Sequence, residues 1–432
     1  MKHEQIDLFA ASYEAPSLPS HIRLIEFFAG MGCQAKGLDI IHADYEHWRT
    51  CEWSWQSIIA YNAIHIKTTE DYSKPFSYDE ILNAIRGVSH DYNQPMTEKQ
   101  LRAKGEEWAR KVYNAMIGNN NFCPDISKLH AKDLDIEDKE NNTYILTYSF
   151  PCQDLSLAGQ HEGMEKGSGT RSGLLWEVER ILNECKELDA LPQVLIMENV
   201  PQVCGSSNLK PWGEWLLALE EMGYTNYFKI LNSKDYGIPQ NRKRCFMVSI
   251  LGQKSYLFPK KTKLRYVLKD FIEKKVDEYY YLSDKLVAGF VRHTEKHATK
   301  GNGFAFKPQD GSQVSGSIVC EQGNHPTDTF IDETPVSSKE SEDLSTPLGK
   351  DYSLPKKRYR KLTEGECMRL MGFEKKDTEA CRKAGLSRAN IWHQSGDGLV
   401  TTIIAGLVGS LLGIDYKKDI EEYVDKLHNE VI

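Results

Sequence analysis

Short apolar runs alternate with amphipathic stretches along the first 250 or so residues of the chain. The apolar runs predict β-strands at 22–28, 48–51, 144–150, 193–197 and 226–231. Stretches whose apolar residues recur every three or four positions predict helices at 172–185 and 211–223. Strands that alternate with helices usually form a parallel sheet with helices on both faces. The expected fold class is therefore α/β, with a doubly wound, Rossmann-like sheet that binds ligands at the carboxyl ends of its strands.

Two stretches depart from this alternation. Residues 66–122 are polar with helical spacing, which predicts a helical insertion whose role the pattern does not give. Leu399–Ile414 is an uncharged run of 16 residues. It is shorter than the roughly 20 residues that span a bilayer, so we expect a buried helix.

The N-terminal residues 1–20 are polar and lack the apolar run of a secretory signal, which favours a cytoplasmic location.

The composition suits a large globular chain. It has 432 residues, of which 40% are hydrophobic, enough for one large domain and a second, smaller one. The 10 cysteines are spread singly, with neither a C-x-x-C pair nor a histidine cluster at metal-ligand spacing. We therefore expect no metal site and no disulfide framework.

Charge is segregated along the chain, whose net charge is -8. Residues 242–307 hold 16 Lys and Arg against 6 Asp and Glu, whereas residues 308–351 hold 2 against 9. Five basic residues then follow within 356–361. Such charged runs form solvent-exposed faces about as often as binding surfaces, so the motifs beside them in the sequence decide between the two interpretations.

Candidate ligand-binding residues follow the first two predicted strands. A turn at 29–32 contains Gly30 and Gly32, which allow the backbone to approach a ligand closely. Glu52 and Trp53 end the second strand, where an acidic side chain can bind ribose hydroxyls and an indole can stack on a base. Each signal alone also fits an ordinary strand–helix junction with a packed tryptophan.

A thiol and a carboxylate follow the next two predicted strands. Cys152 lies in a Pro-Cys-Gln loop after 144–150, and Glu198 follows 193–197. A cysteine is more often a small buried side chain, and a strand-end glutamate is often a helix cap. The proline and the Gly-rich stretch at 158–173 favour an exposed loop, so the two side chains form a candidate nucleophile and acid pair.

Such a pair suits methylation at carbon 5 of cytosine. That carbon is a poor nucleophile until a thiolate adds to carbon 6 and an acid protonates N3. None of these atoms is reachable inside a duplex, so the base must be flipped out.

Seven sequence blocks, in order, resemble those of the DNA (cytosine-5)-methyltransferase family. They are FAGMG at 28–32, Glu52-Trp53, FPCQ at 150–153, ENV at 198–200, QNRKR at 240–244, RKLTEGECMRLMGF at 360–373 and SGDGLVTTIIAGLVGSLL at 395–412. The resemblance covers about residues 22–414, although 66–122 and 253–355 carry no family motif. It implies an S-adenosylmethionine-dependent fold with a smaller target-recognition domain, and double-stranded DNA as partner.

The resemblance also assigns roles to residues. It makes Cys152 the nucleophile and Glu198 the N3 proton donor, with Gln240, Arg242 and Arg244 completing the catalytic set. The implied S-adenosylmethionine contacts are Phe28, Ala29, Gly30, Met31, Gly32, Glu52, Trp53, Asp125, Ile126, Pro151, Gly398 and Leu399. The implied DNA contacts are Gln153, Ser156, Arg171, Lys356, Lys357 and Arg358.

By the same resemblance, residues 20–252 form the catalytic domain, 253–390 the target-recognition domain, and 391–432 helices that return to the catalytic domain. The target sequence cannot be read from these residues. We expect a monomer, with a cognate restriction endonuclease as a further partner left open.

Three alternatives stay open at this point. They are a tRNA cytosine-C5 methyltransferase, an inactive DNA-binding homologue and, from the strand–turn–helix opening alone, a dinucleotide-dependent oxidoreductase. One position also departs from the family pattern, because Asp397 stands where an asparagine is usual. An ionised carboxylate cannot donate a hydrogen bond, so we expect a compensating donor nearby.

Overall fold

The computed structural model describes residues 15–91, 93–151, 164–167, 171–252, 255–298, 305–334 and 358–431. Its main sheet has six strands in the order β2-β1-β3-β4-β6-β5. The strands are β1 (His21–Phe27), β2 (Tyr45–Cys51), β3 (Asn142–Tyr148), β4 (Val194–Asn199), β5 (Tyr224–Asn232) and β6 (Lys243–Leu251). The five predicted strands are confirmed as β1 to β5, and the fold class is the expected α/β Rossmann-like sheet.

The expectation of a parallel sheet is wrong for β6, which lies between β4 and β5. Strands β1 to β4 pair in parallel, but β6 is antiparallel to both β4 and β5. Residues 233–242, which join β5 to β6, contain only a single 3-10 turn and no crossover helix. A connection this short can return the chain only in the antiparallel sense.

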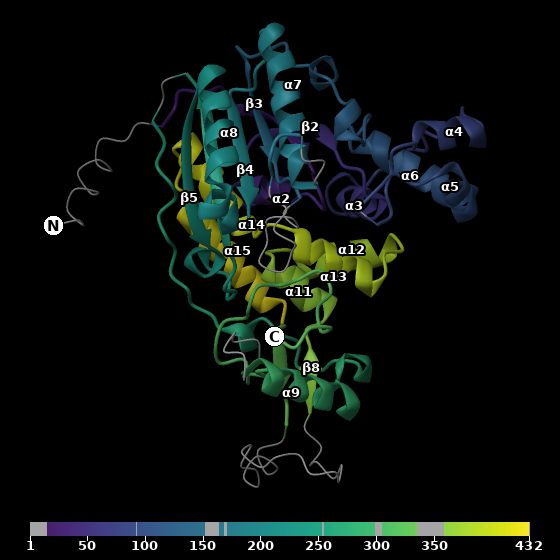
Figure 1. Ribbon diagram of the computed structural model, residues 1–432, viewed down its shortest axis with the longest axis vertical. Coiled ribbons are helices and arrows are strands. Elements are labelled where there is room, and N and C mark those ends of the chain that lie inside the picture. The colour runs from purple at the N-terminus through teal and green to yellow at the C-terminus, as the bar shows by residue number, and fades with distance from the viewer. Residues whose placement is uncertain are drawn as a thin grey trace, which may run out of the picture.

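Helices cover both faces of the sheet (Figure 1). One face packs on α2 (Cys33–Ile40) and α14 (Thr401–Leu412), the other on α7 (Leu175–Glu187) and α8 (Leu209–Glu221). All residues of β3 and β4 are buried, and neighbours such as Ile145 and Leu146 contribute to opposite cores. This arrangement is that of strands enclosed by helices on both sides.

The predicted insertion is helical, as expected. It contains α4 (Tyr78–Ala84), α5 (Glu98–Lys104) and α6 (Glu106–Gly118), and follows α3 (Trp55–Tyr61) with its π-helical extension at Asn62–Ile66. Figure 1 shows these helices gathered beside the end of the sheet at which α3 lies.

The C-terminal half begins away from the sheet and returns to it. A small unit contains α9 (Asp284–Ala298) and the antiparallel pair β7 (Phe330–Asp332) and β8 (Tyr359–Lys361), and it lies at the far end of the molecule (Figure 1). The helices after it are α11 (Glu364–Leu370), α12 (Lys375–Lys383), α13 (Arg388–Asp397), α14 and α15 (Tyr416–Asn429).

Helix α14 is the buried helix predicted from the uncharged run. The stretch Arg388–Leu412 is long and apolar enough to cross a membrane by composition, but 78% of its most apolar window is buried inside the protein. Gly37 of α2 allows a close approach, because a Cβ added there would lie 2.6 Å from Ile404 Cβ. The stretch is therefore part of the core of this fold.

Candidate active site

A cavity of about 400 Å³ lies at the carboxyl ends of the parallel strands. Its wall comes from the turn after β1, the residues that end β2, the loop after β3, the end of β4 and the junction between α13 and α14. This position is the one expected for a ligand site in a doubly wound sheet. The volume is in the range of small-molecule sites.

Most of the predicted site residues that the structure describes line this cavity. They are Phe28, Ala29, Gly30, Met31, Glu52, Trp53, Asp125, Ile126, Pro151, Glu198, Arg242, Arg244, Gly398 and Leu399. Segments from both halves of the chain therefore meet in one wall.

The turn after β1 is tied to the end of β2 through Glu52. Gly30 N donates to Glu52 Oε2 at 2.8 Å, and Ser54 N donates to Oε1 at 2.7 Å. Burial raises the pKa of Glu52 to about 7. Because each carboxylate oxygen can accept more than one hydrogen bond, Glu52 retains the capacity to bind a hydroxyl of a ligand.

The two glycines of this turn both have a positive φ, but only at Gly32 would a side chain also collide with a neighbour. Gly30 has a φ of +55°, and a Cβ added there would meet nothing within 4 Å, so it faces open space. Gly32 has a φ of +79°, and a Cβ there would collide with the His65 ring. Gly32 is not among the cavity residues, and the close approach that it allows is to the His65 side chain.

The far wall of the cavity combines an acidic group with apolar surface. Asp125 lies beside Ile126 and accepts a hydrogen bond from Ser127 N at 3.1 Å, while Arg180 Nη2 donates to Ile126 O at 3.1 Å. These bonds fix a segment that lines the same cavity as Trp53. The cavity can therefore bind a planar ring between the apolar side chains of Trp53 and Ile126, with the Asp125 carboxylate as a hydrogen-bond acceptor.

Glu198 lies at the end of β4, where its side chain is only 9% exposed. Burial raises its pKa above the usual range, and the nearby Arg244 and Arg242 oppose that rise. Arg244 Nε lies 3.1 Å from Glu198 Oε1. A buried carboxyl with a raised pKa keeps a proton at higher pH than an exposed one, so Glu198 can act as a general acid.

The loop that leads to Cys152 is fixed at its start. Asn199 Nδ2 donates to Phe150 O at 3.0 Å, and Ser172 Oγ donates to Pro151 O at 2.8 Å. Cys152 itself, with Gln153 and Ser156, lies outside the described residues. The sequence reasoning missed both positioning residues, although Asn199 follows Glu198 directly and a buried strand-end amide is a signal for such a bond.

Gln240 and Arg242 hold segments of the chain together. The Gln240 amide donates to Leu370 O at 2.7 Å and accepts from Ile318 N at 3.0 Å, and Gln240 is not among the cavity residues. Arg242 is 2% exposed and donates to Ile318 O at 2.8 Å and to Gly396 O at 2.7 Å. Arg242 and Arg244 of this block line the cavity and Gln240 does not, so the catalytic role of Gln240 stays a prediction.

The predicted DNA contacts either do not line the cavity or fall outside the described residues. Arg171 donates to Asn93 Oδ1 at 2.8 Å. Arg358 donates to Glu278 Oε1 at 2.6 Å and lies over the Tyr281 ring, so it already has an intramolecular partner. Lys356 and Lys357 fall outside the part of the chain that the structure describes.

Asp397, the departure from the family pattern, lines the cavity and makes two hydrogen-bonding contacts. Its Oδ2 lies 3.0 Å from His393 Nε2, and its Oδ1 accepts from Cys320 Sγ at 3.0 Å. Although desolvation at the cavity wall opposes the effect, these partners hold the pKa of the partly exposed Asp397 carboxylate below its usual range. Two donors are therefore in contact with the carboxylate that replaces the amide.

Comparisons with known proteins agree with this geometry. A family model described as C-5 cytosine-specific DNA methylase matches residues 76–411. The type II methyltransferase M2.ScrFI of Lactococcus lactis subsp. cremoris is 32% identical over 394 residues, which cover 90% of this chain and 99% of that protein. The orphan methyltransferase M.SssI of Spiroplasma monobiae is 36% identical over 291 residues, which cover 65% of this chain and 72% of that protein.

Solved structures share the fold at lower identity. The crystal structure of the S. pombe Dnmt2 methyltransferase matches with a TM-score of 0.58 and 16% identity, over 91% of this chain and 98% of that chain. The Entamoeba histolytica methyltransferase EhMeth matches with a TM-score of 0.58 and 17% identity, over 91% of this chain and 98% of that chain.

Proposed function

The chain belongs to the family of C-5 cytosine-specific DNA methylases, and from this premise we propose that it acts on a cytosine flipped out of duplex DNA and bound covalently to Cys152. It is a DNA cytosine-5 methyltransferase. The observation that carries the finer proposal is Glu198, a buried carboxyl with a raised pKa beside the strand that leads to Cys152.

The cavity residues fit S-adenosylmethionine, the methyl donor that the family implies. Gly30 leaves open space at the turn, Glu52 can accept from ribose hydroxyls, and Asp125 can accept from an adenine amino group. Trp53 and Ile126 offer apolar surface for the adenine ring. When bound, the cofactor supplies an electrophilic methyl group. The junction between α13 and α14 completes the cavity wall.

The first step assigned to the protein is nucleophilic addition. The Cys152 thiolate forms a bond to carbon 6 of cytosine, and the Glu198 carboxyl gives its proton to N3. The ring thereby becomes an enamine whose carbon 5 can attack an electrophile. Asn199 and Ser172 position the start of the Cys152 loop for this step.

The second step releases the product. After carbon 5 has gained the methyl group, a base removes the proton from carbon 5 and the electron pair re-forms the ring double bond as the Cys152 thiolate leaves. Glu198, now a carboxylate, takes back the N3 proton. Arg244 beside Glu198 stabilises that carboxylate and can donate to the cytosine O2.

Target recognition is assigned to residues 253–390, between a catalytic domain at 20–252 and the returning helices at 391–432. The segregated charge of this segment supports the assignment, because basic residues bind phosphate and position the duplex. Lys356 and Lys357 are the stronger candidates, since Arg358 already pairs with Glu278.

Assembly, location and partners also stay proposals. We propose a monomer that lies in the cytoplasm with its DNA. A type II relative supports a cognate endonuclease and an orphan relative supports its absence, so neither is favoured. The tRNA alternative is less well supported, because the matched family model is one of DNA methylases.

Bisulfite sequencing of plasmid DNA from cells that express the chain tests activity and target together. We expect protected cytosines at one recurrent sequence with wild-type protein and none with Cys152→Ser, because a serine hydroxyl is almost wholly protonated at neutral pH. Cys204→Ser, at a half-buried cysteine outside the cavity, is the matched control and should retain the wild-type pattern. Protection that persists in Cys152→Ser would contradict the proposed nucleophile.

A further inference from the structure

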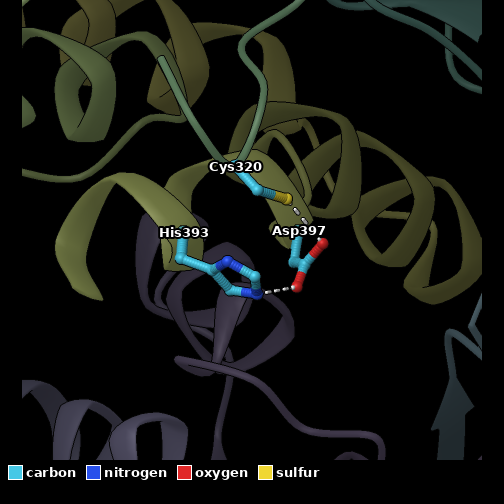
Figure 2. Close-up of side chains that lie close together, drawn as sticks. All are labelled: Cys320, His393 and Asp397. Carbon is cyan, nitrogen blue, oxygen red and sulfur yellow. Dashed lines mark hydrogen bonds and ion pairs between the residues drawn. The ribbon is translucent and has the colours of Figure 1, made fainter. Parts of the chain in front are cut away.

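A thiol, an imidazole and a carboxylate meet where the segment 305–334 touches helix α13. His393 and Asp397 are one turn apart on α13 and share a face, whereas Cys320 comes from a loop that precedes the helix in the chain. Figure 2 shows the Cys320 thiol and the His393 ring at different oxygens of the Asp397 carboxylate. One candidate ligand atom from each residue lies within 4.8 Å of the other two.

We propose that Cys320, His393 and Asp397 form a binding site for a divalent cation of the zinc type. A thiolate and an imidazole favour zinc and cobalt over magnesium and calcium, which prefer sites made of oxygen alone. Three protein ligands with a fourth position open to solvent are an established arrangement for zinc. The proposal stands independently of the proposed mechanism of methylation.

The distances are compatible with such a site after a small movement. Zinc–ligand bonds of about 2.0–2.3 Å place the ligand atoms of a tetrahedron roughly 3.3–3.7 Å apart. The contacts of 3.0 Å that Asp397 makes with Cys320 and His393 must lengthen slightly, and any ligand atoms as far as 4.8 Å apart must approach by about 1 Å. Movements of this size are within the reach of side-chain rotation. Binding replaces the thiol proton by the metal and ends the hydrogen bond from Cys320 to Asp397, and both atoms then become ligands.

Contacts next to the three residues hold their two chain segments together. Arg242 donates to Ser317 Oγ and Ile318 O on one side and to Gly396 O and Gly398 O on the other, so one guanidinium joins the two segments. A Cβ added to Gly396 would collide with the backbone of Cys320, so the loop rests directly on the helix backbone. A site whose supports are already rigid loses little entropy when it binds a ligand.

The site is accessible and adjoins the cavity. The Asp397 side chain is 45% exposed, which leaves room for a water molecule as fourth ligand. Asp397 also lines the candidate active site, so a bound cation would fasten the segment 305–334 to the wall of that cavity. The sequence did not predict the site, because its members are separated in the chain and come together only through folding.

Cobalt titration of the full-length chain tests the proposal, because a thiolate ligand gives Co²⁺ a charge-transfer absorption band. We expect metal-stripped wild-type protein to bind one equivalent with this band, and Zn²⁺ to displace it. Cys320→Ser should abolish the band, and His393→Gln and Asp397→Asn should each weaken binding at least about tenfold. Thermal unfolding of the metal-free variants verifies that each is folded.

Three matched controls exclude other ligands. Cys204→Ser removes another half-buried thiol, and His130→Gln removes a histidine that pairs with Glu184 at 3.2 Å, as His393 pairs with Asp397. Cys152→Ser removes the proposed nucleophile. All three should bind Co²⁺ as wild type does. A wild-type protein without the band, or a band that survives Cys320→Ser or disappears in Cys152→Ser, would overturn the proposal.

A second measurement needs no variant. Alkylation of wild-type protein, followed by peptide mass spectrometry, reports each thiol separately. Zn²⁺ should slow the alkylation of Cys320 at least about tenfold and leave Cys204 unchanged, because a metal-bound thiolate is shielded from reaction. Equal rates at Cys320 with and without Zn²⁺ would contradict the site.

Discussion

The environment of Glu198 combines two opposing influences on one carboxyl group. Burial at the end of β4 favours the neutral form, while Arg244 and Arg242 favour the carboxylate. The net effect is a raised pKa, so the acid form persists into the range in which an exposed glutamate has lost its proton. The two arginines limit the rise, and this balance suits a group that must both donate a proton and take it back.

The balance at Glu198 predicts the pH dependence of an Arg244 variant. The methylation rate should fall as pH rises through the pKa of Glu198, because the proton donor is lost. Arg244→Gln removes a positive charge 3.1 Å from Oε1, so the pKa rises further and the fall in rate should move to higher pH. Arg244→Lys keeps the charge and should keep the wild-type profile. Single-turnover rates measured across pH give the apparent pKa of this fall separately from the maximal rate. An apparent pKa that is unchanged in Arg244→Gln would contradict the assignment of Glu198 as the acid.

Glu26 is a second buried carboxyl, next to the last residue of β1, and it has no assigned role in catalysis. It is 0% exposed, accepts from Tyr61 Oη at 2.5 Å, and burial raises its pKa to about 8. The folded state therefore holds a proton that the unfolded state releases near pH 4.5. The stability that depends on this proton is complete below about pH 4.5 and is lost as pH rises towards about 8.

Glu26→Gln should remove this pH dependence. The difference in free energy of unfolding between the variant and the wild type should increase by about 1.4 kcal/mol for each pH unit between the unfolded-state pKa of 4.5 and the folded-state pKa of about 8. Urea unfolding at about pH 5.5 and about pH 7.5 measures the increase, with Glu107→Gln on the exposed face of α6 as control. A difference that does not grow with pH would show that Glu26 is ionised in the folded protein.

At the scale of elements, the hydrophobic pattern was sufficient for β1 to β5 but not for the direction of β6, which lies between β4 and β5. An apolar run identifies a buried strand, and β3 and β4 are buried on both faces. The pattern does not record strand direction, which depends on the connection. The short link from β5 to β6 reverses the sense that the alternation predicted.

Two glycine-to-alanine substitutions in helices should change the stability of the protein in opposite directions. One is at the contact between α2 and α14, and the other is on the exposed side of α8. Gly37→Ala places a methyl group 2.6 Å from Ile404 Cβ, so overpacking should destabilise the protein by about 1–3 kcal/mol. Gly213→Ala, on the exposed side of α8 with nothing within 4 Å, should stabilise it by about 0.5–1 kcal/mol through helix propensity. Chemical denaturation of both variants measures the pair. A Gly37→Ala protein as stable as the wild type would show that the two helices are not packed this closely.

At the scale of the whole molecule, the net charge of -8 conceals the segregated charge of residues 242–351. Folding further changes which of the basic residues are available, because Arg358 pairs with Glu278 and Arg242 is buried among carbonyl groups. Sequence counts of basic residues therefore overstate the surface that can bind phosphate.

Lys356 and Lys357 should carry more of the DNA affinity than Arg358. Replacing the two lysines by alanine should weaken binding to all duplexes alike. It should also lower the slope of log affinity against log salt by about 0.9 for each phosphate that the variant no longer binds. Arg358→Ala should lower the slope less, because this side chain already has a carboxylate partner. Fluorescence anisotropy at several salt concentrations measures the slopes, and a changed methylation sequence in the lysine variant would instead indicate base contacts.

The sequence located most of the candidate site because its blocks follow strand ends, and strand ends converge in this fold. Phe28, Glu52 and Glu198 could be placed in this way. Gly32 and Gln240 do not line the cavity, because Gly32 packs against His65 and Gln240 bonds to Leu370 and Ile318, and their roles stay predictions. The Cys320, His393 and Asp397 cluster could not be predicted, since only the folded chain brings the loop onto α13.

The central claim is that Cys152 adds to carbon 6 and that a base later removes the proton from carbon 5. Fluorine at carbon 5 cannot be removed in that way, so DNA with 5-fluorocytosine at the target should trap the enzyme. Wild-type protein mixed with this DNA and S-adenosylmethionine should give an adduct that survives denaturation and maps to Cys152 by peptide mass spectrometry. Glu198→Gln should form it about 10² to 10⁴ times more slowly, since an amide cannot deliver the N3 proton. An adduct at any of the other cysteines, or formation of the adduct by Cys152→Ser, would contradict the account.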